Sequence, residues 1–313
     1  MARIQELMQH DVAGDPMTGV RWTRRTTEKI AAELSQLGIQ VCPNTVARLL
    51  KQLEFRLRAN QKRISRASDP DRDAQFLYIA SQKEDFLARG LPVLSVDSKK
   101  RQLVGNFRNA GRTWEQQPRR VNDHDFPSDA EGVALPYGVY DLGANLGSLF
   151  VGTTHDTPAF AAANLARWWV YDGRHRYPGA TELLVLADSG GSNGYRTRAW
   201  KHALQEVVCD RHRLTVTVCH YPTSASKWNP IEHHMFSEIS KNWAGQPLQS
   251  YQTILNYART TRTFGGLEIK SYLVPTDYPK GLKICARQMD TVQLRPHLTQ
   301  PTRNYTISPR PAL

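Results

Sequence analysis

The amino-acid sequence predicts an α/β protein in which a mixed-sheet domain is preceded by a small helical domain. Three observations lead to this prediction. Two β-rich runs stand close together early in the larger part of the chain, and strands then alternate with helices. Residues 20–66 hold two short amphipathic segments followed by a basic stretch. The chain has 313 residues, of which 40% are hydrophobic, enough for one large and one small domain.

The charge and the cysteine content of the chain limit its possible binding partners and its cellular location. The formal net charge is +12 and the isoelectric point about 9.7, so nucleic acids and anionic membrane surfaces would both attract the chain. No apolar run approaches the roughly 18 residues of a bilayer-spanning helix, and the first residues lack the apolar segment of a signal peptide. We therefore expect nucleic acid as the partner and no membrane. The four cysteines lack zinc-site or disulfide-framework spacing, which favours a cytoplasmic location.

Residues 1–66 are expected to form a helix-turn-helix DNA-binding domain. The first helix has Thr27 as its cap and ends at Gly38, and the second has Pro43 in its first turn. Two short helices joined by a tight connection are typical of this motif. The outer face of the second helix would contact DNA through four polar side chains: Asn44, Thr45, Arg48 and Lys51.

A basic segment follows the second helix, as a wing or arm would. Residues 1–66 contain twelve Lys and Arg against six Asp and Glu, so about a fifth of the chain carries half of the net charge. The side chains of this segment expected to contact DNA are Arg56, Arg58, Lys62 and Arg63. An ordinary helical hairpin with a solvated outer face is the alternative interpretation.

The larger domain is predicted to span residues 91–285, after a linker helix at 67–90. Its β-rich runs predict a hairpin over 92–107 and one or two strands over 137–155, with a polar loop insertion at 108–136 between them. Strands and helices then alternate: helices over 157–173, 193–208, from 229 and over 250–261, and strands over 181–188 and 214–222.

This order, an early hairpin followed by alternating helices and strands, is that of an RNase H-like domain. Residues 286–313 contain several prolines and little apolar content, so they are predicted to form an extended or disordered tail.

Three acids of this domain are placed to meet at one edge of its sheet. Asp97 and Asp188 each end an apolar strand, which puts them at the sheet rim. Asn229 and Pro230 resemble a cap and a first helical residue. On that helix Glu232 lies within the apolar stripe, where an ionised carboxylate is costly without a partner. The stripe consists of Ile231, Met235, Phe236, Ile239 and Trp243.

Three carboxylates are hard oxygen ligands that suit Mg²⁺ or Mn²⁺. Two such ions about 3.5–4 Å apart can activate an attacking hydroxyl and stabilise a leaving oxygen in phosphoryl displacement. Asp97 and Asp188 alone would each be explained as turn residues, and Glu232 as a solvated first-turn acid. Order, spacing and orientation together favour a shared metal site. Of the competing acids, Asp141 is mid-strand, and Asp156 or Thr157 would cap a helix.

Side chains around the three acids are further candidates for contacts with DNA phosphates or bases: Lys99, Lys100, Asn193, Lys227, Trp228 and His234. Each has a second interpretation. The lysines after Asp97 would otherwise form a solvated hairpin edge, and Asn193 would cap a helix after a plain glycine-rich turn. Trp228 would otherwise pack against the core, and His234 would lie at the rim of the site.

Several blocks of sequence resemble one family. They include "VDSKKRQLVGNFRNAGRTW", "DSGGSNGYRTRAWKHALQ" and "TVCHYPTSASKWNPIEHHMFSEISKNWAGQPL". From about residue 15 to 310 the chain resembles the Rhodopirellula-type DDE transposases of bacterial insertion sequences, which are distant relatives of the Tc1/mariner group. The resemblance implies an RNase H-like catalytic domain with Asp97, Asp188 and Glu232 as its acids. Ser189 stands where a glycine is expected and Pro230 where a lysine is usual. Compared with the N-terminal domain of other family members, that of this chain is expected to be truncated.

We therefore expect a DNA transposase that uses metal ions, two in number, to hydrolyse a phosphodiester at the element's end and join the freed 3′-hydroxyl to target DNA. Its partners would be double-stranded DNA, as inverted-repeat ends and target, and further copies of itself on that DNA. Its location would be the nucleoid in the bacterial cytoplasm. Two alternatives stay open: a catalytically inactive or truncated DNA-binding remnant or repressor, and an RNase H-like nuclease.

Overall fold

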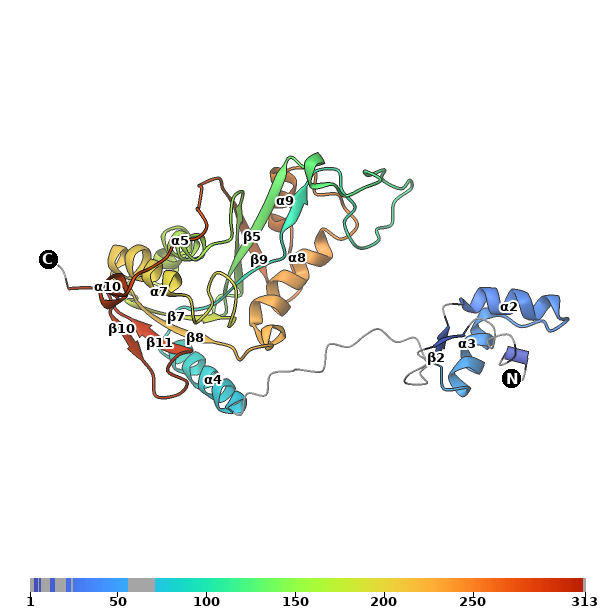
Figure 1. Cartoon of the computed structure of the whole chain (residues 1–313), viewed down its shortest axis with the longest axis horizontal. Coiled ribbons are helices and arrows are strands. Elements are labelled where there is room, and N and C mark those ends of the chain that lie inside the picture. Colours follow the sequence, from blue (N-terminus) through green and yellow to red (C-terminus); the bar gives the residue numbers. More distant parts are fainter. Residues whose placement is uncertain are drawn as a thin grey trace. The chain divides into compact units, whose positions relative to one another are not determined.

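The computed structural model describes residues 3, 4, 6, 12–14, 21–23, 25–55 and 71–311. The chain divides into two units, Met1–Ile64 and Ser65–Leu313, and each is described by itself (Figure 1). Among the described residues, no helix combines the length and the apolar character that crossing a bilayer requires.

The described part of the first unit includes the antiparallel strands β1 (Val12–Gly14) and β2 (Arg21–Thr23) and the helices α2 (Thr27–Gln36) and α3 (Pro43–Gln52). The helices pack through apolar faces that bury Ile30, Leu34 and Val46. The cap of α2 is Thr26, whose hydroxyl accepts a hydrogen bond from a first-turn amide (3.3 Å). The prediction of Thr27 as the cap was wrong by one residue, because Thr27 already has helical geometry.

The outer face of α3 has the polar character that the sequence predicts. Asn44, Arg48 and Lys51 are exposed, and Thr45 is half-buried with its hydroxyl 3.3 Å from the thiol of Cys42. The predicted wing residues lie outside the described residues: Arg56, Arg58, Lys62 and Arg63.

Within residues 71–311, the second unit is built on a mixed nine-stranded sheet. The strand order is β10-β11-β8-β7-β3-β5-β6-β9, and β4 pairs with β5. The central strands β3, β7 and β8 are mutually parallel, β5 is antiparallel to β3 and β6, and β9 is parallel to β6. The bounds are β3 (Val93–Ser98), β4 (Gln102–Val104), β5 (Gly132–Asp141), β6 (Leu146–Gly152), β7 (Glu182–Ala187), β8 (Thr215–His220), β9 (Glu268–Val274), β10 (Leu294–Pro296) and β11 (Asn304–Ile307).

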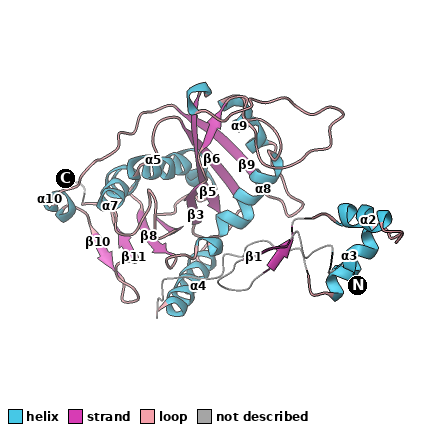
Figure 2. Cartoon of the chain, turned by 45° about the vertical axis from the view of Figure 1, so that its right-hand side comes forward, coloured by secondary structure: helices cyan, strands magenta, loops and turns pink. Residues whose placement is uncertain are grey.

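Helices cover both faces of this sheet. One face is covered by α5 and α7, and the opposite face by α4, α8 and α9 (Figures 1 and 2). The bounds are α4 (Arg72–Ala88), α5 (Pro158–Trp168), α6 (Arg174–Arg176), α7 (Arg198–Leu204), α8 (Ser237–Asn242), α9 (Tyr251–Arg259) and α10 (Ala286–Asp290). π-Helical turns continue α5 and α7 and precede α8: Trp169–Gly173, Gln205–Asp210 and Glu232–Phe236.

The continuous apolar run of β7 follows from its place between two helical layers. Leu183 and Val185 pack in the core on the α5 and α7 face, whereas Leu184 and Leu186 pack against α4. A strand that is buried on both faces needs apolar residues at every position rather than at alternate ones. The segment predicted as a linker helix is therefore a packed layer of the second unit.

One prediction about strand pairing was wrong, and one strand was not predicted. The runs at Val93–Ser98 and Gln102–Val104 do not form a hairpin, because both pair with β5. The strand Glu268–Val274 was not predicted, and it lies at the sheet edge beside β6. In both cases the partner strand is distant in sequence, which local patterns do not reveal.

The prediction of an extended or disordered tail over 286–313 was also wrong. This segment folds as α10, β10 and β11, and β11 is antiparallel to β8 in the main sheet. All four residues of Asn304–Ile307 are buried. Three of its four strand residues, Asn304, Tyr305 and Thr306, make side-chain hydrogen bonds, so a polar composition is compatible with burial here and gave the wrong answer.

Candidate active site

Asp97 and Asp188 lie side by side at the carboxyl edge of the parallel strands β3 and β7. Val96 pairs with Ala187 across these strands, so the residues that follow them reach the same edge of the sheet. Both aspartates are half-buried. The register of two parallel strands therefore brings together the acids that the sequence singled out.

Glu232 approaches this edge from the helix that begins at Pro230. Its apolar stripe is buried as predicted, with Ile231, Met235 and Phe236 fully inside the core. Glu232 is half-buried and starts a π-helical turn, a feature that often occurs at functional sites. The stripe holds the helix against the sheet while the carboxylate stays at its rim.

Gly138 allows this helix to come close to the sheet. Gly138 lies on β5 and pairs with Asp97 of the neighbouring strand β3. A Cβ atom at this position would lie 2.6 Å from the Ile231 Cδ1 atom and 2.6 Å from the Phe236 Cε1 atom. The missing side chain at Gly138 is therefore a condition for the position of Glu232, and no sequence pattern had indicated it.

The acids share an unfavourable electrostatic environment. Burial, with the charge of Asp188 as the next cause, raises the pKa of Asp97 to about 8. Burial also raises the pKa of Asp188, to which the charge of Glu232 adds, while a hydrogen bond from Asn229 opposes the shift. Each acid thus increases the cost of ionising another, and a cation at this edge would relieve that cost.

The side chain of Asn229 holds Asp188 and β3 together instead of capping the helix. Its amide nitrogen donates to Asp188 Oδ1 (3.1 Å) and to the carbonyl of Val96 (3.3 Å). Its oxygen accepts from the hydroxyl of Ser95 (2.5 Å), which in turn accepts from the amide of Ile231 (3.0 Å). The cap prediction was wrong, because the residue before a proline is extended and its side chain is free to turn toward the sheet.

Lys99 is directed toward the helix that carries Glu232 rather than toward solvent. Its Nζ donates to the Ser240 hydroxyl (2.5 Å) and to the Phe236 carbonyl (3.4 Å), and it lies over the rings of Phe236 and Trp243. Burial lowers the pKa of Lys99, and the charge of Glu232 opposes this shift. Lys99 therefore fastens β3 to α8, while Lys100 is exposed.

The remaining predicted DNA contacts are divided between exposed and buried positions. Asn193 is buried and accepts a hydrogen bond from the Ser192 hydroxyl (2.9 Å); it caps no helix, since α7 begins only at Arg198. Trp228 is 54% exposed and packs its edge against Phe76 of α4. Lys227 lies over the ring of Trp228, with its Nζ 5.2 Å from the ring centroid. The exposed His234 stacks on Tyr140, and their ring centroids are 5.6 Å apart.

The competing acids have different roles. Asp141 is buried and accepts hydrogen bonds from the Tyr177 hydroxyl at 2.9 and 3.0 Å. The helix cap is Thr157, whose hydroxyl accepts from the Phe160 amide (3.3 Å), and not Asp156. Asp156 is exposed, and its charge is a smaller contribution to the raised pKa of Asp97.

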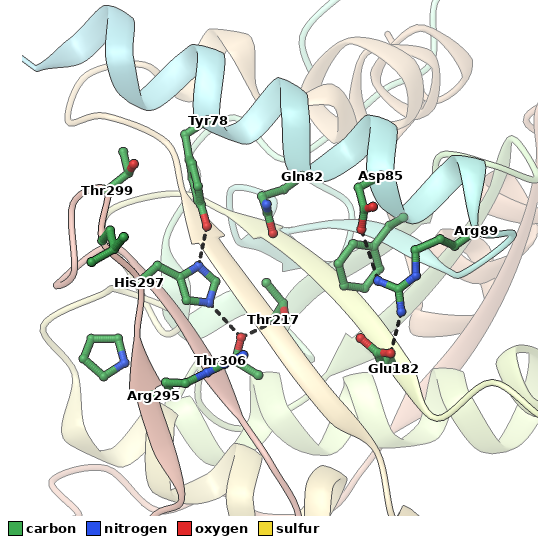
Figure 3. A pocket seen from close by; sticks show the side chains of 13 residues that line it. Tyr78, Gln82, Asp85, Arg89, Glu182, Thr217, Arg295, His297, Thr299 and Thr306 are labelled. Atoms are coloured by element: carbon green, nitrogen blue, oxygen red, sulfur yellow. Dashed lines mark hydrogen bonds and ion pairs between the residues drawn. The ribbon is translucent and has the colours of Figure 1, made fainter.

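One cavity of the second unit lies apart from the three acids. A cavity of about 540 Å³ between α4 and the β10–β11 hairpin contains none of them (Figure 3). Its polar side chains bind one another: the Tyr78 hydroxyl and His297 Nδ1 are 2.6 Å apart, and His297 Nε2 is 2.7 Å from the Thr306 hydroxyl. This cavity is consequently not the active site.

The chemistry of the three acids fits a divalent cation. Among residues 71–311 and the described part of the first unit, no group of three His, Cys, Asp or Glu side chains is arranged to hold a metal ion as the side chains stand. The acids nevertheless supply hard carboxylate oxygens, and burial together with the charge of a neighbouring acid raises the pKa values of Asp97 and Asp188. A divalent ion is the partner that this combination favours.

Comparison with known proteins identifies the family. Residues 3–309 match the family described as Rhodopirellula transposase DDE domain. The chain belongs to this family. It is a DNA transposase of the DDE type, as the resemblance of its sequence blocks implied. None of the curated proteins is similar enough in sequence to match the chain.

Solved structures similar to this transposase are complexes of Mos1 transposase. The Mos1 paired-end complex with left transposon end has 14% sequence identity and a TM-score of 0.43, over 82% of this chain and 68% of that one. The Mos1 strand transfer complex has 15% identity and a TM-score of 0.43 over the same shares. The mariner Mos1 paired end complex with Mg has 13% identity and a TM-score of 0.44, again over 82% and 68%.

Replacing Gly138 by alanine should loosen the contact between the sheet and the helix that carries Glu232. We expect Gly138→Ala to lower the free energy of unfolding by about 1–3 kcal/mol, because the new methyl group overpacks Ile231 and Phe236. DNA cleavage should fall further than stability predicts, since Glu232 moves with the helix. The control is Gly265→Ala, whose Cβ would meet its nearest atom at 3.7 Å. Denaturant unfolding measures the free energy of unfolding of both variants. Equal free energies for Gly138→Ala and Gly265→Ala would contradict the packing role of Gly138.

The raised pKa of Asp97 makes stability depend on pH. Because its pKa in the folded state is about 8, against about 3.9 unfolded, its stabilising contribution is complete below pH about 4 and is lost as the pH rises toward 8. Asp97→Asn removes this loss. In metal-free buffer the variant should melt several °C above the parent at pH 8, with a smaller difference at pH 5. The exposed Asp129→Asn is the control, and a difference independent of pH would refute the assignment.

Proposed function

We propose that Asp97, Asp188 and Glu232 are the catalytic acids of this transposase and that they hold Mg²⁺ or Mn²⁺, in a pair of ions. The observation that carries this proposal is the register of β3 and β7, which places the two aspartates at one sheet edge. The electrostatic coupling of Glu232 to Asp188 and Asp97 supports its membership of the site. The RNase H-like arrangement is supported by the mixed sheet, in which three parallel strands are followed by antiparallel β5.

When bound, the metal ions would polarise the scissile phosphate and lower the pKa of the attacking water. In the hydrolysis, the water oxygen attacks phosphorus at the element's end and the bond to the 3′-oxygen breaks. That 3′-hydroxyl then attacks a phosphodiester of the target, and the target's own 3′-oxygen leaves. The chain's residues orient the acids for these steps: Asn229 fixes the Asp188 carboxylate, and Lys99 fixes the helix that carries Glu232.

DNA would be bound by both units of the chain. In the first unit, the exposed polar face of α3 supports a helix-turn-helix that reads transposon-end DNA. In the second unit, Lys100, Lys227 and His234 are exposed near the acids and would contact the phosphate backbone. Trp228 has an exposed ring that would stack on a base. We further propose that the transposase acts as a homo-oligomer on inverted-repeat ends and target DNA.

Loss of any one acid should abolish both cleavage and strand transfer while DNA binding is retained. The variants are Asp97→Asn, Asp188→Asn and Glu232→Gln, tested on labelled element-end DNA with Mg²⁺ or Mn²⁺. Glu238→Gln is the matched control, since Glu238 lies on the same helix and pairs with Lys241 instead. Strand transfer by Asp188→Asn in either metal would show that the catalytic assignment is wrong.

The DNA-binding role of α3 predicts a change in salt dependence. Arg48→Ala and Lys51→Ala should each weaken binding to element-end DNA and reduce the slope of log K against log salt by about 1, because one phosphate contact is lost. Lys29→Ala removes the same charge from an exposed position of α2 and serves as the control. Titrations at several salt concentrations measure the slopes, and identical slopes in all three variants would exclude α3 as the contact surface.

A further inference from the structure

His220 connects the core of the sheet to the backbone of Asp188. It is the last residue of β8 and is fully buried. Its Nδ1 is 2.9 Å from the carbonyl oxygen of Asp188, and its Nε2 is 3.1 Å from the hydroxyl of Tyr305 on β11. The same hydroxyl accepts a hydrogen bond from the Trp200 indole (3.1 Å). Four residues from four different elements thus form one continuous chain of hydrogen bonds.

The chemistry of the two ends fixes the direction of every bond in this chain. An indole nitrogen only donates, so Trp200 donates to the Tyr305 oxygen. A carbonyl only accepts, so the proton of His220 is on Nδ1 and points at Asp188. The Nε2 atom is therefore without a proton, and it accepts from the Tyr305 hydroxyl. Burial lowers the pKa of His220 to about 4, which keeps this single neutral tautomer at neutral pH.

The backbone of His220 is held by a further hydrogen bond. The amide of Gln75, from α4, donates to the His220 carbonyl and to Asn304 Oδ1, each at 2.8 Å. Asn304 donates back to the Gln75 oxygen (2.7 Å). Because Asn304 and Tyr305 are neighbours on β11, the C-terminal strand fixes His220 from two sides.

We propose that the chain Trp200–Tyr305–His220 positions Asp188 for metal binding, with His220 as a positioning residue of the active site. Asp188 is then held at both ends: its backbone by His220 and its carboxylate by Asn229. Two fixed points restrict the residue to one orientation, and partners behind metal ligands commonly set metal affinity in this way. This inference rests on the proposed function, since it takes Asp188 as a metal ligand.

Two substitutions of His220 separate positioning from simple packing. In His220→Asn the side-chain amide occupies the place of Nδ1 and keeps a donor for Asp188. In His220→Gln the amide reaches the place of Nε2 and leaves the Asp188 carbonyl without its donor. Both lose the imidazole ring, so a merely structural role would affect them alike. The control is His297→Gln, which removes a partly buried histidine that bonds Tyr78 and Thr306 and none of the three acids within residues 71–311.

The measurement is the dissociation constant of Mn²⁺ from the full chain without DNA at neutral pH. It is obtained from the electron paramagnetic resonance signal of free Mn²⁺. We expect His220→Gln to raise it about 10-fold or more, and His220→Asn to raise it less than about threefold. Asp188→Asn should raise it at least as much as His220→Gln, and His297→Gln should leave it unchanged. Thermal melting of each variant checks that it is folded.

The outcomes distinguish this inference from the proposed function. If Asp188→Asn weakens Mn²⁺ binding but the two His220 variants behave alike, the positioning role is overturned and the catalytic assignment stands. If Asp188→Asn binds Mn²⁺ as the parent does, the proposed metal site is wrong and the inference falls with it. Should His220→Gln not fold, nitrogen chemical shifts of His220 in the parent decide instead: a proton on Nε2 would overturn the proposal, and one on Nδ1 that Tyr305→Phe displaces would support it.

Discussion

The close approach of like-charged carboxyl groups is the constraint on which the rest of the second unit depends. Carboxylates at one sheet edge repel each other, and burial adds to the cost of ionising them, as the raised pKa values of Asp97 and Asp188 show. The surrounding fold must therefore hold the acids together before any cation arrives. The pairing of β3 with β7 holds the two aspartates together. The apolar stripe of the Glu232 helix packs against the sheet over Gly138 and holds Glu232 beside them.

Neutral polar side chains hold Asp188 in place. Asn229 and Ser95 join β3, Asp188 and the start of the helix that carries Glu232 through hydrogen bonds. His220 holds the backbone of Asp188 from the other side. A fixed positive side chain next to Asp188 would neutralise it and weaken its attraction for a metal ion. Uncharged donors orient the carboxylate and leave its charge available, which explains why amides and a neutral imidazole occupy these positions.

The sequence was sufficient for features that depend on local pattern. The strands that end at Asp97 and Asp188, and the helix stripe around Glu232, follow from periodicity that a few residues determine. The side-chain role of Asn229 was missed because a helix cap is the local explanation for Asn before Pro. Tyr305 and its strand were missed because Asn304–Ile307 has only four residues, too few for its alternation of polar and apolar side chains to indicate a strand. Its burial results from β8, more than 80 residues earlier in the chain, and not from its own composition.

The active edge is consequently a product of the whole second unit. Ser95, Asp188, Asn229 and Tyr305 come from four distant segments, and each is fixed only when the others are present. Each of these contacts joins residues far apart in the sequence, so ordering it costs more chain entropy than a local contact does. A shorter piece of this chain that ends before β11 would retain all three acids but lose the bonds that hold His220. The presence of the three acids in a sequence is thus not sufficient for their arrangement, which also depends on the C-terminal strand β11.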